Sequence, residues 1–505
     1  MTNPTEVELK FLVPPAARSA VAAEMARVTS TLQRTTLAAV YLDTPDGRLA
    51  NAGFAWRLRR EGRQWVQTLK APGGSAVERF EHEVVRPGPT ADATLHAATG
   101  PGRKLAALLE RCAADGVEPG VRCRTEVRRL SRRTRTRGGV VEIAFDEGRI
   151  LAGEARQRIC EVEFEVVSGP ASAMLALAER WRRRFGLIHD PRRKSERGDR
   201  LADGFEFPPL RKAQRPAYAA TAGVAAAFAA VVDECLAQVM HNGLGLCVGE
   251  PASRAEHVHQ LRVGVRRLRS ALRSFQGWVP EVPAPLVDGL RGLFVELGTA
   301  RDADVLGEGV AAALREVGAP TLTLPVDGEG VDPVELMRSD RAQALLLAWL
   351  AWRAGGEPAA DAEPAAADEP IALAGAAARR LRRWHRRIAG DWKNFDGLDE
   401  PALHALRKHI KRQRYAVEFL APALRRRTVQ RYLKVLAPIQ ERLGDLNDLF
   451  VARERYHALV ASDPRAWFAL GWLAARIAEV RALAKPALGD LAASRPPSAR
   501  GRGPG

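Results

Sequence analysis

The sequence predicts a chain of two parts, an α+β region dominated by antiparallel strands followed by a region that is entirely helical. Between residues 6 and 85, apolar and polar side chains alternate in short runs separated by turn signals such as Asp46-Gly47 and Glu61-Gly62. This pattern is typical of strands joined by tight turns. After Tyr218 the alternation stops and helical periodicity replaces it. The helical part also contains a repeat, which predicts two similar bundles related by duplication.

The strand and helix patterns define the expected elements and domains. Further alternating segments lie at 121–130, 140–146 and 159–167, and helical patterns at about 15–28, 103–114 and 171–186. We therefore predict a strand-rich domain at 1–205, a linker at 206–215, and a helical domain at 216–493. The aperiodic Ala/Pro/acidic stretch 354–370 is expected to be a flexible loop, and 494–505 a disordered tail.

The composition indicates an intracellular globular protein. A chain of 505 residues with 46% hydrophobic residues is too long for one core and should fold into several domains. Its five cysteines are scattered and form no C-x-x-C pair, which argues against disulfide partners and zinc ribbons. The apolar runs 222–232 and 342–352 are too short to span a membrane, and no signal peptide is visible. We expect a cytoplasmic protein without a membrane partner.

The charge balance points to a polyanionic partner. The net charge of +17 and a pI near 10.3 favour nucleic acid, polyphosphate or an anionic surface. Of 77 basic residues only ten are lysines, so the positions that keep lysine are informative. They include Lys10, Lys70, Lys194, Lys408 and Lys411.

Charged side chains share one face on several predicted strands. Glu6, Glu8 and Lys10 alternate with apolar residues, and Glu161, Glu163 and Glu165 do the same near the end of the region. A solvated sheet face explains any single strand. It explains the whole set less well, because three glutamates on one face repel one another without cations. If these faces point into a barrel, the lumen can coordinate a hard divalent cation and bind phosphoryl oxygens.

These residues, in this order, resemble the CYTH superfamily of triphosphate tunnel metalloenzymes over about residues 4–203. The motifs that carry the resemblance are Glu6-x-Glu8-x-Lys10, Tyr41-Leu-Asp-Thr-Pro-Asp46, Arg57-x-Arg59, Thr68-x-Lys70, Glu81-x-Glu83 and Glu161-x-Glu163-x-Glu165. The resemblance implies an eight-stranded antiparallel tunnel that hydrolyses triphosphates with Mg²⁺ or Mn²⁺.

The same resemblance assigns roles to single residues. The metal ligands would come from Glu6, Glu8, Glu161, Glu163 and Glu165, and the catalytic set would be Glu6, Glu8, Lys10 and Asp146. The phosphate chain would be bound by Lys10, Arg57, Arg59, Lys70, Arg79, Arg124, Arg128 and Lys194. The strand at 122–129 can be aligned in more than one register, which leaves open which of its arginines point inward. A P-loop mechanism is excluded, because the chain has no G-x-x-x-x-G-K-[ST] motif.

A basic stripe appears twice in the helical part. His259, Arg262, Arg266, Arg269 and Arg273 recur at steps of three and four, opposite an apolar stripe at 261, 265, 268, 272 and 275. The second copy, offset by 145 residues, carries His404, Arg407, Lys411 and Arg414. A solvated helix face normally carries compensating acids, and these stripes have almost none, which favours an anionic ligand.

The repeated motifs resemble the CHAD domain over roughly 216–490. They are His259-x-x-Arg262 with Arg266-Arg267-Leu-Arg269, Glu296-Leu-Gly-x-x-Arg301-Asp302-x-Asp304, and their second copies. The resemblance implies paired helical bundles around a groove for inorganic polyphosphate. The residues expected to bind it are His259, Arg262, Arg266, Arg267, Arg269, His404, Arg407, Lys408, Lys411, Arg412 and Arg414.

The sequence therefore favours an inorganic triphosphatase joined to a polyphosphate-binding module, with polyphosphate granules as a further location. One alternative keeps the tunnel and changes the substrate, as in an adenylyl cyclase or a thiamine triphosphatase. Another is a scaffold without catalysis that binds polyphosphate or RNA. RNA is the weaker partner, because few aromatic residues accompany the basic stripes.

Overall fold

The computed structural model describes residues 5–27, 31–73, 78–305, 309–322, 331–355 and 372–500, with side chains from Glu6 and none at 299–305. The predicted loop at 354–370 lies almost wholly outside these residues, as do the side chains of Arg301, Asp302 and Asp304. The chain divides into two compact units. One contains residues 1–211, 237–257 and 334–360, and the other contains 212–236, 258–333 and 361–505.

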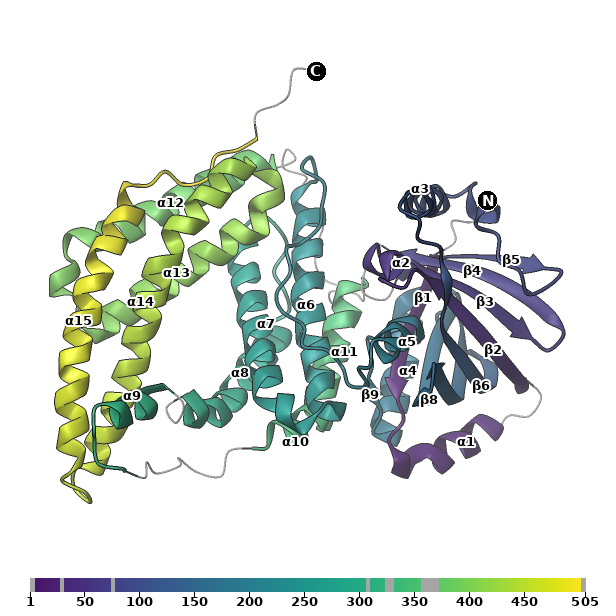
Figure 1. Cartoon of the computed structure of the whole chain (residues 1–505), viewed down its shortest axis with the longest axis horizontal. Coiled ribbons are helices and arrows are strands. Elements are labelled where there is room, and N and C mark those ends of the chain that lie inside the picture. The colour runs from purple at the N-terminus through teal and green to yellow at the C-terminus, as the bar shows by residue number, and fades with distance from the viewer. Residues whose placement is uncertain are drawn as a thin grey trace. The chain divides into compact units, whose positions relative to one another are not determined.

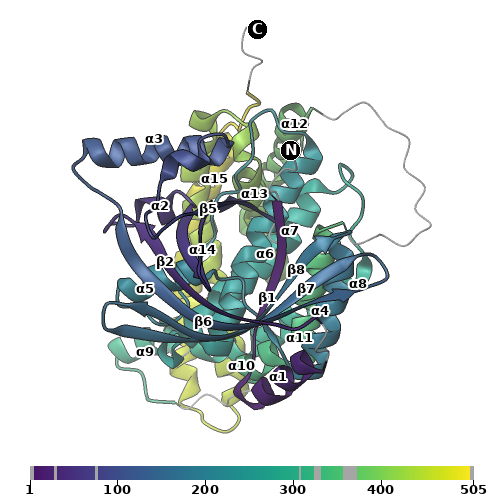
Figure 2. The same cartoon turned by 90° about the vertical axis from the view of Figure 1, so that its right-hand side faces the viewer.

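The first unit is built on a closed antiparallel barrel (Figures 1 and 2). Its strands are β1 (Thr5–Leu12), β2 (Gln33–Asp43), β3 (Ala55–Glu61), β4 (Gln64–Pro72), β5 (Glu78–Arg86), β6 (Gly120–Arg135), β7 (Val140–Ala152) and β8 (Ala155–Ser168). The order β5-β4-β3-β2-β6-β7-β8-β1 closes through a β1–β5 pairing, and the short β9 (Ile188–His189) adds to β1. This confirms the predicted eight-stranded antiparallel barrel. The β1–β5 seam is short, with three paired positions from Thr5↔Phe80 to Val7↔Glu78.

Helices pack against the barrel. The predicted helices are present as α1 (Arg18–Ala26), α3 (Gly100–Ala114) and α4 (Ala171–Phe185), beside the short α2 (Arg48–Asn51). The helix α5 (Lys194–Ala202), which the sequence analysis did not predict, packs against β6, β7 and β8. Its Leu201 joins the apolar cluster of Tyr41, Cys123 and Ile150. A Cβ at Gly198 would lie 2.1 Å from the Cys123 Sγ, so this close approach requires glycine.

The barrel unit also contains segments from the helical part of the sequence. The helix α11 (Asp340–Arg353) packs against α4 and β9, and α10 (Pro333–Arg338) precedes it. The side chain of Gln343 accepts a hydrogen bond from the His189 backbone N–H at 2.9 Å. An ion pair of 2.9 Å joins Arg182 to Asp340.

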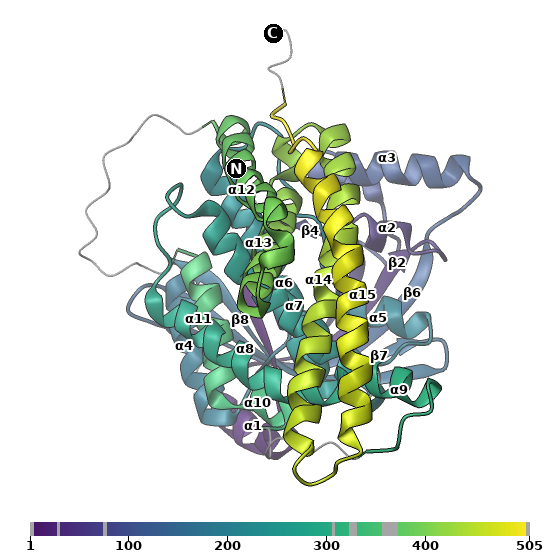
Figure 3. The same cartoon turned by 90° about the vertical axis from the view of Figure 1, so that its left-hand side faces the viewer.

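The remaining helices come from the part of the chain that the sequence predicts to be wholly helical. They are α6 (Val224–Val248), α7 (Arg254–Phe275), α8 (Ala284–Val305), α9 (Ala311–Glu316), α12 (Leu373–Lys393), α13 (Glu400–Leu420), α14 (Arg426–Leu459) and α15 (Ala466–Ala493). The four helices α12 to α15 pack side by side (Figure 3). The apolar stripes of α7 and α13 are buried, as shown by Leu261, Val265, Leu406 and Ile410.

Two details differ from what the sequence suggested. The helix α6 has the length and composition of a membrane span, although 56% of its most apolar window is buried within the protein, as in a core helix. Residues 494–500, predicted to be disordered, run beside the start of α14, where Ser498 accepts a hydrogen bond from the Arg425 backbone N–H at 3.1 Å.

Candidate functional site

The barrel encloses a charged cavity of about 640 Å³. Its walls combine acids and bases from most of the strands. The acids are Glu6, Glu8, Glu61, Glu81, Glu83, Glu142, Glu163 and Glu165; the bases are Lys10, Arg57, Arg59, Lys70, Arg79, Arg129, Arg133, Arg193 and Lys194. A lumen with both signs of charge can bind cations and anions together.

Strand alternation and register bring the two predicted glutamate clusters together. In the β1–β8 pairing, Glu8 lies opposite Glu165 and Lys10 opposite Glu163. Because alternate side chains of a strand point to the same face, Glu6, Glu8 and Lys10 all reach the lumen from β1. The apolar residues between them, such as Leu9 and Phe11, are buried on the other face.

Three lumen acids, Glu6, Glu81 and Glu165, share one nearby cation, Lys70. Lys70 is the centre of this group, with its Nζ 2.6 Å from Glu6 and 3.2 Å from Glu81. Burial, followed by the nearby Glu6 and Glu81, raises the pKa of Glu165 to about 8. Burial also raises the pKa of Glu6, although Lys70 opposes this shift. Carboxylates whose ionised forms are disfavoured in this way suit a bound cation.

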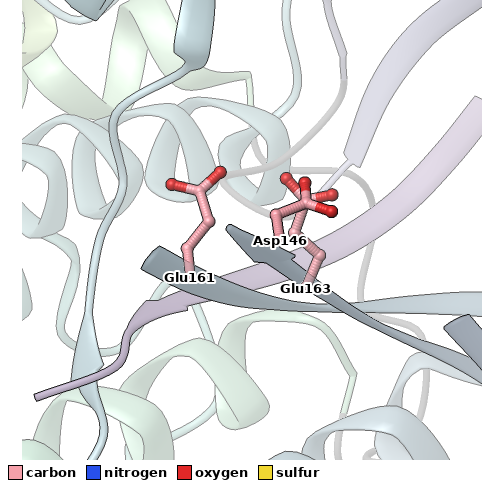
Figure 4. Close-up of side chains that lie close together, drawn as sticks. All are labelled: Asp146, Glu161 and Glu163. Carbon is pink, nitrogen blue, oxygen red and sulfur yellow. The ribbon is translucent and has the colours of Figure 1, made fainter. Parts of the chain in front are cut away.

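A second group of acids is already neutralised. Asp146, Glu161 and Glu163 lie close enough to hold a metal ion, with ligand oxygens within 4.8 Å of one another (Figure 4). The Nζ of Lys194 is 2.8, 2.6 and 2.7 Å from these three carboxylates in that order. Arg129 donates two hydrogen bonds of 2.7 Å to Asp146. Burial alone would raise the pKa of Asp146, but Lys194 and Arg129 hold it below its ordinary value.

The two acid groups therefore differ in what they can bind. The cations Lys194 and Arg129 also hold the pKa of Glu163 well below its usual range, against the effect of burial. Glu161 accepts a hydrogen bond of 2.9 Å from Arg197. Acids outnumber cations around Lys70, which is near Glu6, Glu81 and Glu165 together. Hard carboxylate oxygens of this kind are the ligands that Mg²⁺ and Mn²⁺ prefer.

The predicted arginines of β3 both reach the lumen. Arg57 and Arg59 both contact Glu83, at 3.4 and 3.3 Å, and Arg57 donates to the Thr68 hydroxyl at 3.1 Å. The Nε atoms of both arginines are buried and have no hydrogen-bond partner among the described residues. Burial, and then the proximity of Arg57, lowers the pKa of Arg59. Two adjacent guanidinium groups with unused donors are suited to phosphate oxygens.

Four residues predicted for this site do not line the cavity. Arg124 and Arg128 are exposed and do not line the cavity, because the inward positions of β6 are the odd-numbered ones, including Arg129. The predicted substrate contacts of Arg124 and Arg128 are therefore wrong. Asp146 and Glu161 are fully buried and do not line the cavity either. Both lie on the inner face of the barrel, because Asp146 is paired directly with Arg129 in the β6–β7 register and with Glu161 in the β7–β8 register, and both contact Lys194.

Several lumen residues were missing from the predicted site. Glu81 and Glu83 belong to an alternating motif that the sequence showed, but their partners Lys70 and Arg57 became visible only in the fold. Arg193 gave no periodic signal, because it precedes α5 in a loop. Burial, followed by Arg79, lowers the pKa of Arg193 to about 10. With Ser195, it also lines a second cavity of about 420 Å³.

The basic stripes of α7 and α13 converge in the helical unit. Arg262, Arg266 and Arg269 surround the Phe294 ring at 4.9, 5.7 and 5.5 Å from its centroid. Burial lowers the pKa of Arg407, and Arg266 lowers it further against the opposing effect of Asp448. Arginines of the two stripes therefore lie close enough to repel one another.

The other predicted polyphosphate-binding residues differ in accessibility. Lys408 and His404 are exposed, and the His404 ring pairs with Asn447 at 3.0 Å. His259, Lys411, Arg412 and Arg414 are half-buried. Arg267 is only 1% exposed and donates a hydrogen bond of 2.9 Å to the Gln214 carbonyl. Arg262 is also buried, at 9% exposed, and the binding roles of both arginines stay predictions.

Comparison with known proteins identifies both parts of the chain. Residues 4–198 match the CYTH domain and residues 230–457 match the CHAD domain. An uncharacterized protein of Mycobacterium tuberculosis is 34% identical over 218 residues, which is 40% of this chain and 40% of that protein. An inorganic triphosphatase of Haemophilus influenzae is 27% identical over 34% of this chain and 48% of its own length. The matched segments thus span less than half of these relatives.

Solved structures include a similar helical domain. The crystal structure of the CHAD domain from the plant Ricinus communis is 29% identical, covers 58% of this chain and 99% of that chain, and has a TM-score of 0.47. The CYTH match coincides with the charged barrel, and the CHAD match coincides with the helices that follow it. The chain consists of a CYTH domain followed by a CHAD domain.

Proposed function

We propose that the chain is a metal-dependent inorganic triphosphatase whose helical part binds inorganic polyphosphate. The observation that carries the proposal is the shared cavity, which contains carboxylates short of cations and arginines with unused donors. The similarity to an inorganic triphosphatase of Haemophilus influenzae supports the same reaction.

In this proposal the acidic residues bind the metal ion and the basic residues bind the phosphate chain. Glu6, Glu8 and Glu165 would hold Mg²⁺ or Mn²⁺, which supplies Lewis-acid neutralisation of the phosphoryl oxygens when bound. Lys10, Arg57 and Arg59 bind and orient the phosphate chain. Arg129 and Lys194 are held rigid by Asp146 and Glu163, so they face developing negative charge without reorganising. Glu83, beside the two arginines of β3, can orient the attacking water.

An organic triphosphate is the second candidate substrate. The cavity of about 420 Å³ shares Arg193 and Ser195 with the lumen, and Phe54 lies among its lining residues. This space would accommodate an organic group attached to the phosphate chain. Adenylyl cyclase and thiamine triphosphatase chemistry both need such a group.

The proposal for the helical part rests on the stripes of α7 and α13. Arg266 is close enough to Arg407 to disfavour the charge of Arg407, which a bound polyanion would relieve. A scaffold without catalysis would use the same stripes, but it would give no reason for acids and bases to fill the lumen.

A phosphate-release assay distinguishes the hydrolytic functions, and pyrophosphate release from ATP identifies a cyclase. The full chain, with Mg²⁺ or Mn²⁺, is compared on triphosphate, ATP, thiamine triphosphate and long polyphosphate. We expect fastest release from triphosphate, and loss of at least about 100-fold in Glu6→Gln and Glu8→Gln. Glu126→Gln, on the outside of the barrel, serves as the matched control. Full turnover by the Glu6→Gln/Glu8→Gln double variant, or metal-independent release, would contradict the proposal.

A further inference from the structure

The arginines of β6 that point away from the lumen belong to a larger exposed surface. We define the outer basic face as Arg60, Arg124, Arg128, Arg149, Arg156 and Arg158, all exposed on the outside of β3, β6, β7 and β8. Two outward glutamates, Glu126 and Glu147, accompany these six arginines. The surface is therefore strongly positive, and none of the tunnel chemistry uses it.

The strand register brings these side chains into rows. In the strand register, Ala38 lies opposite Arg60 on one side and Glu126 on the other. Glu126 in turn lies opposite Arg149, and Arg149 lies opposite Arg158. This row crosses five neighbouring strands, which corresponds to about 19 Å at the usual strand spacing. On the same face, Arg128 and Arg124 flank the row from β6, and Arg156 extends it along β8.

The two glutamates do not neutralise this face. Glu126 pairs with Arg149 at 2.6 Å, and Glu147 pairs with Arg18, which lies outside the set. Arg124, Arg128, Arg156 and Arg158 form no ion pair within 4.0 Å with any acid in the described part of the chain. Arg149 and Arg158 are direct cross-strand neighbours, and like charges in such positions destabilise a sheet. A bound polyanion would remove this repulsion.

We propose that the outer basic face binds a linear inorganic polyphosphate chain. Guanidinium groups pair with phosphate oxygens in a bidentate manner and remain charged at all physiological pH values. The outside of a closed barrel is convex. A flexible polyphosphate chain can bend to follow the row of arginines, whereas a straight nucleic-acid duplex would contact the convex surface only along a line. The proposal stands independently of the activity in the tunnel.

The outward residues between the arginines favour a polymer without bases. The row and its flanks contain the non-aromatic residues Thr36, Ala38 and Leu151, and one aromatic side chain, Trp65, lies opposite Arg60 at the end of the row. Single-stranded nucleic acids are normally held by stacking of bases on aromatic rings. Phosphate groups alone are therefore the better match for this surface.

Arginine footprinting on the full chain tests the proposal at single residues. Arginines are modified with a dicarbonyl reagent, with and without long-chain polyphosphate, and the modified peptides are quantified by mass spectrometry. We expect Arg124, Arg128, Arg156 and Arg158 to be protected, and the exposed Arg63, Arg103, Arg111 and Arg183 to react as before. Equal modification at the first four sites, while α7 and α13 are protected, would overturn the proposal.

A variant series measures the contribution of the face to binding. Arg124, Arg128, Arg156 and Arg158 are replaced by glutamine in the full chain, in a background that also carries Arg262→Gln, Arg266→Gln, Arg407→Gln and Lys411→Gln. By analogy with single-stranded nucleic acids, losing four phosphate contacts should flatten the log–log salt dependence of polyphosphate binding by about 3. The matched control replaces Arg63, Arg103, Arg111 and Arg183 by glutamine and should keep the slope. Equal slopes in both variants, or displacement of polyphosphate by single-stranded RNA of matched charge, would contradict the proposal.

Discussion

Arg128 and Arg129 are neighbours in the sequence and face opposite sides of the barrel. Arg129 bonds Asp146 inside, whereas Arg128 lies on the outer basic face. The β2–β6 pairing shifts between Tyr41 and Leu42, whose partners are Cys123 and Val121, so Arg122 has no partner there. A shift of one residue exchanges the two faces of a strand. No local sequence pattern reveals such an irregularity, which explains why the inward arginines were assigned wrongly.

This contrast gives a prediction for a pair of adjacent arginines. Arg129→Gln should lower kcat/KM for triphosphate by about 100-fold, because it removes a fixed positive charge from the lumen. The loss in Arg128→Gln should be at least about tenfold smaller, since this side chain lies outside. Steady-state kinetics of the two variants provides the measurement. Comparable losses would show that both arginines reach the substrate, which the structure does not allow.

At the scale of elements, the positions of strands and helices along the chain were easier to predict than the elements against which they pack. Alternation located the strands, and three-and-four spacing located the stripes of α7 and α13, because both patterns are local. The helix α5 was missed because the segment 194–202 is short and mostly charged, so it shows no helical periodicity. It is stabilised by packing against the barrel. The grouping of α10 and α11 with the barrel unit depends on contacts such as Gln343 with His189, 154 residues apart. Long-range contacts of this kind leave no periodic signal.

The packing of α3 on the barrel contains a buried histidine that should make this segment sensitive to acid. His96 is fully buried, and its ring pairs with His82 at 2.8 Å and with Gln67 at 2.9 Å. Burial, followed by His82, lowers the pKa of His96 to about 4. Its folded pKa lies below its unfolded value, so its contribution to stability is complete above about pH 6.5 and is lost as pH falls through 4.

We therefore expect residues 93–114 to become susceptible to proteolysis between pH 6.5 and pH 4. The measurement is limited proteolysis over this range with a protease active in acid, and His96→Gln should be less sensitive to pH than the wild type. An identical pH profile in His96→Gln would assign the acid sensitivity to other groups.

The facing stripes of α7 and α13 give a second prediction at this scale. Replacing Arg262, Arg266, Arg407 and Lys411 by glutamine should weaken polyphosphate binding and flatten its salt dependence by about 3, by analogy with single-stranded nucleic acids. The apolar residues on the opposite faces are unchanged, so the far-ultraviolet circular dichroism spectrum should be preserved. Salt titrations of the full chain against polyphosphate and RNA provide the measurement. Binding equal to that of wild type would leave the stripes as solvated helix faces.

At the scale of the whole molecule, metal binding should couple stability to pH. The pKa of Glu165 is about 8 without metal, so below that value a cation must displace a proton to bind its carboxylate. The folded pKa lies above the unfolded one, so the stability that Glu165 gives the metal-free protein is lost as pH rises toward 8. Metal affinity should increase over the same interval, by at most about tenfold per pH unit for one displaced proton.

The difference in Tm with and without Mg²⁺ should therefore grow between pH 6 and pH 8. Differential scanning fluorimetry at fixed metal concentration measures it, and Glu165→Gln should show a smaller and flatter difference. A Tm difference that is independent of pH in the wild type would remove Glu165 from the metal site.

The short β1–β5 seam should determine where the barrel opens locally. Three paired positions hold it, whereas β7 and β8 pair along nearly their whole length. Local opening should begin where the fewest backbone hydrogen bonds must break. The seam pairs Glu6 with Arg79, so it contains two of the charged groups that line the lumen. Amide hydrogens along β1 and β5 should therefore exchange faster than those of β7, and a ligand that links the two sides of the seam should slow their exchange.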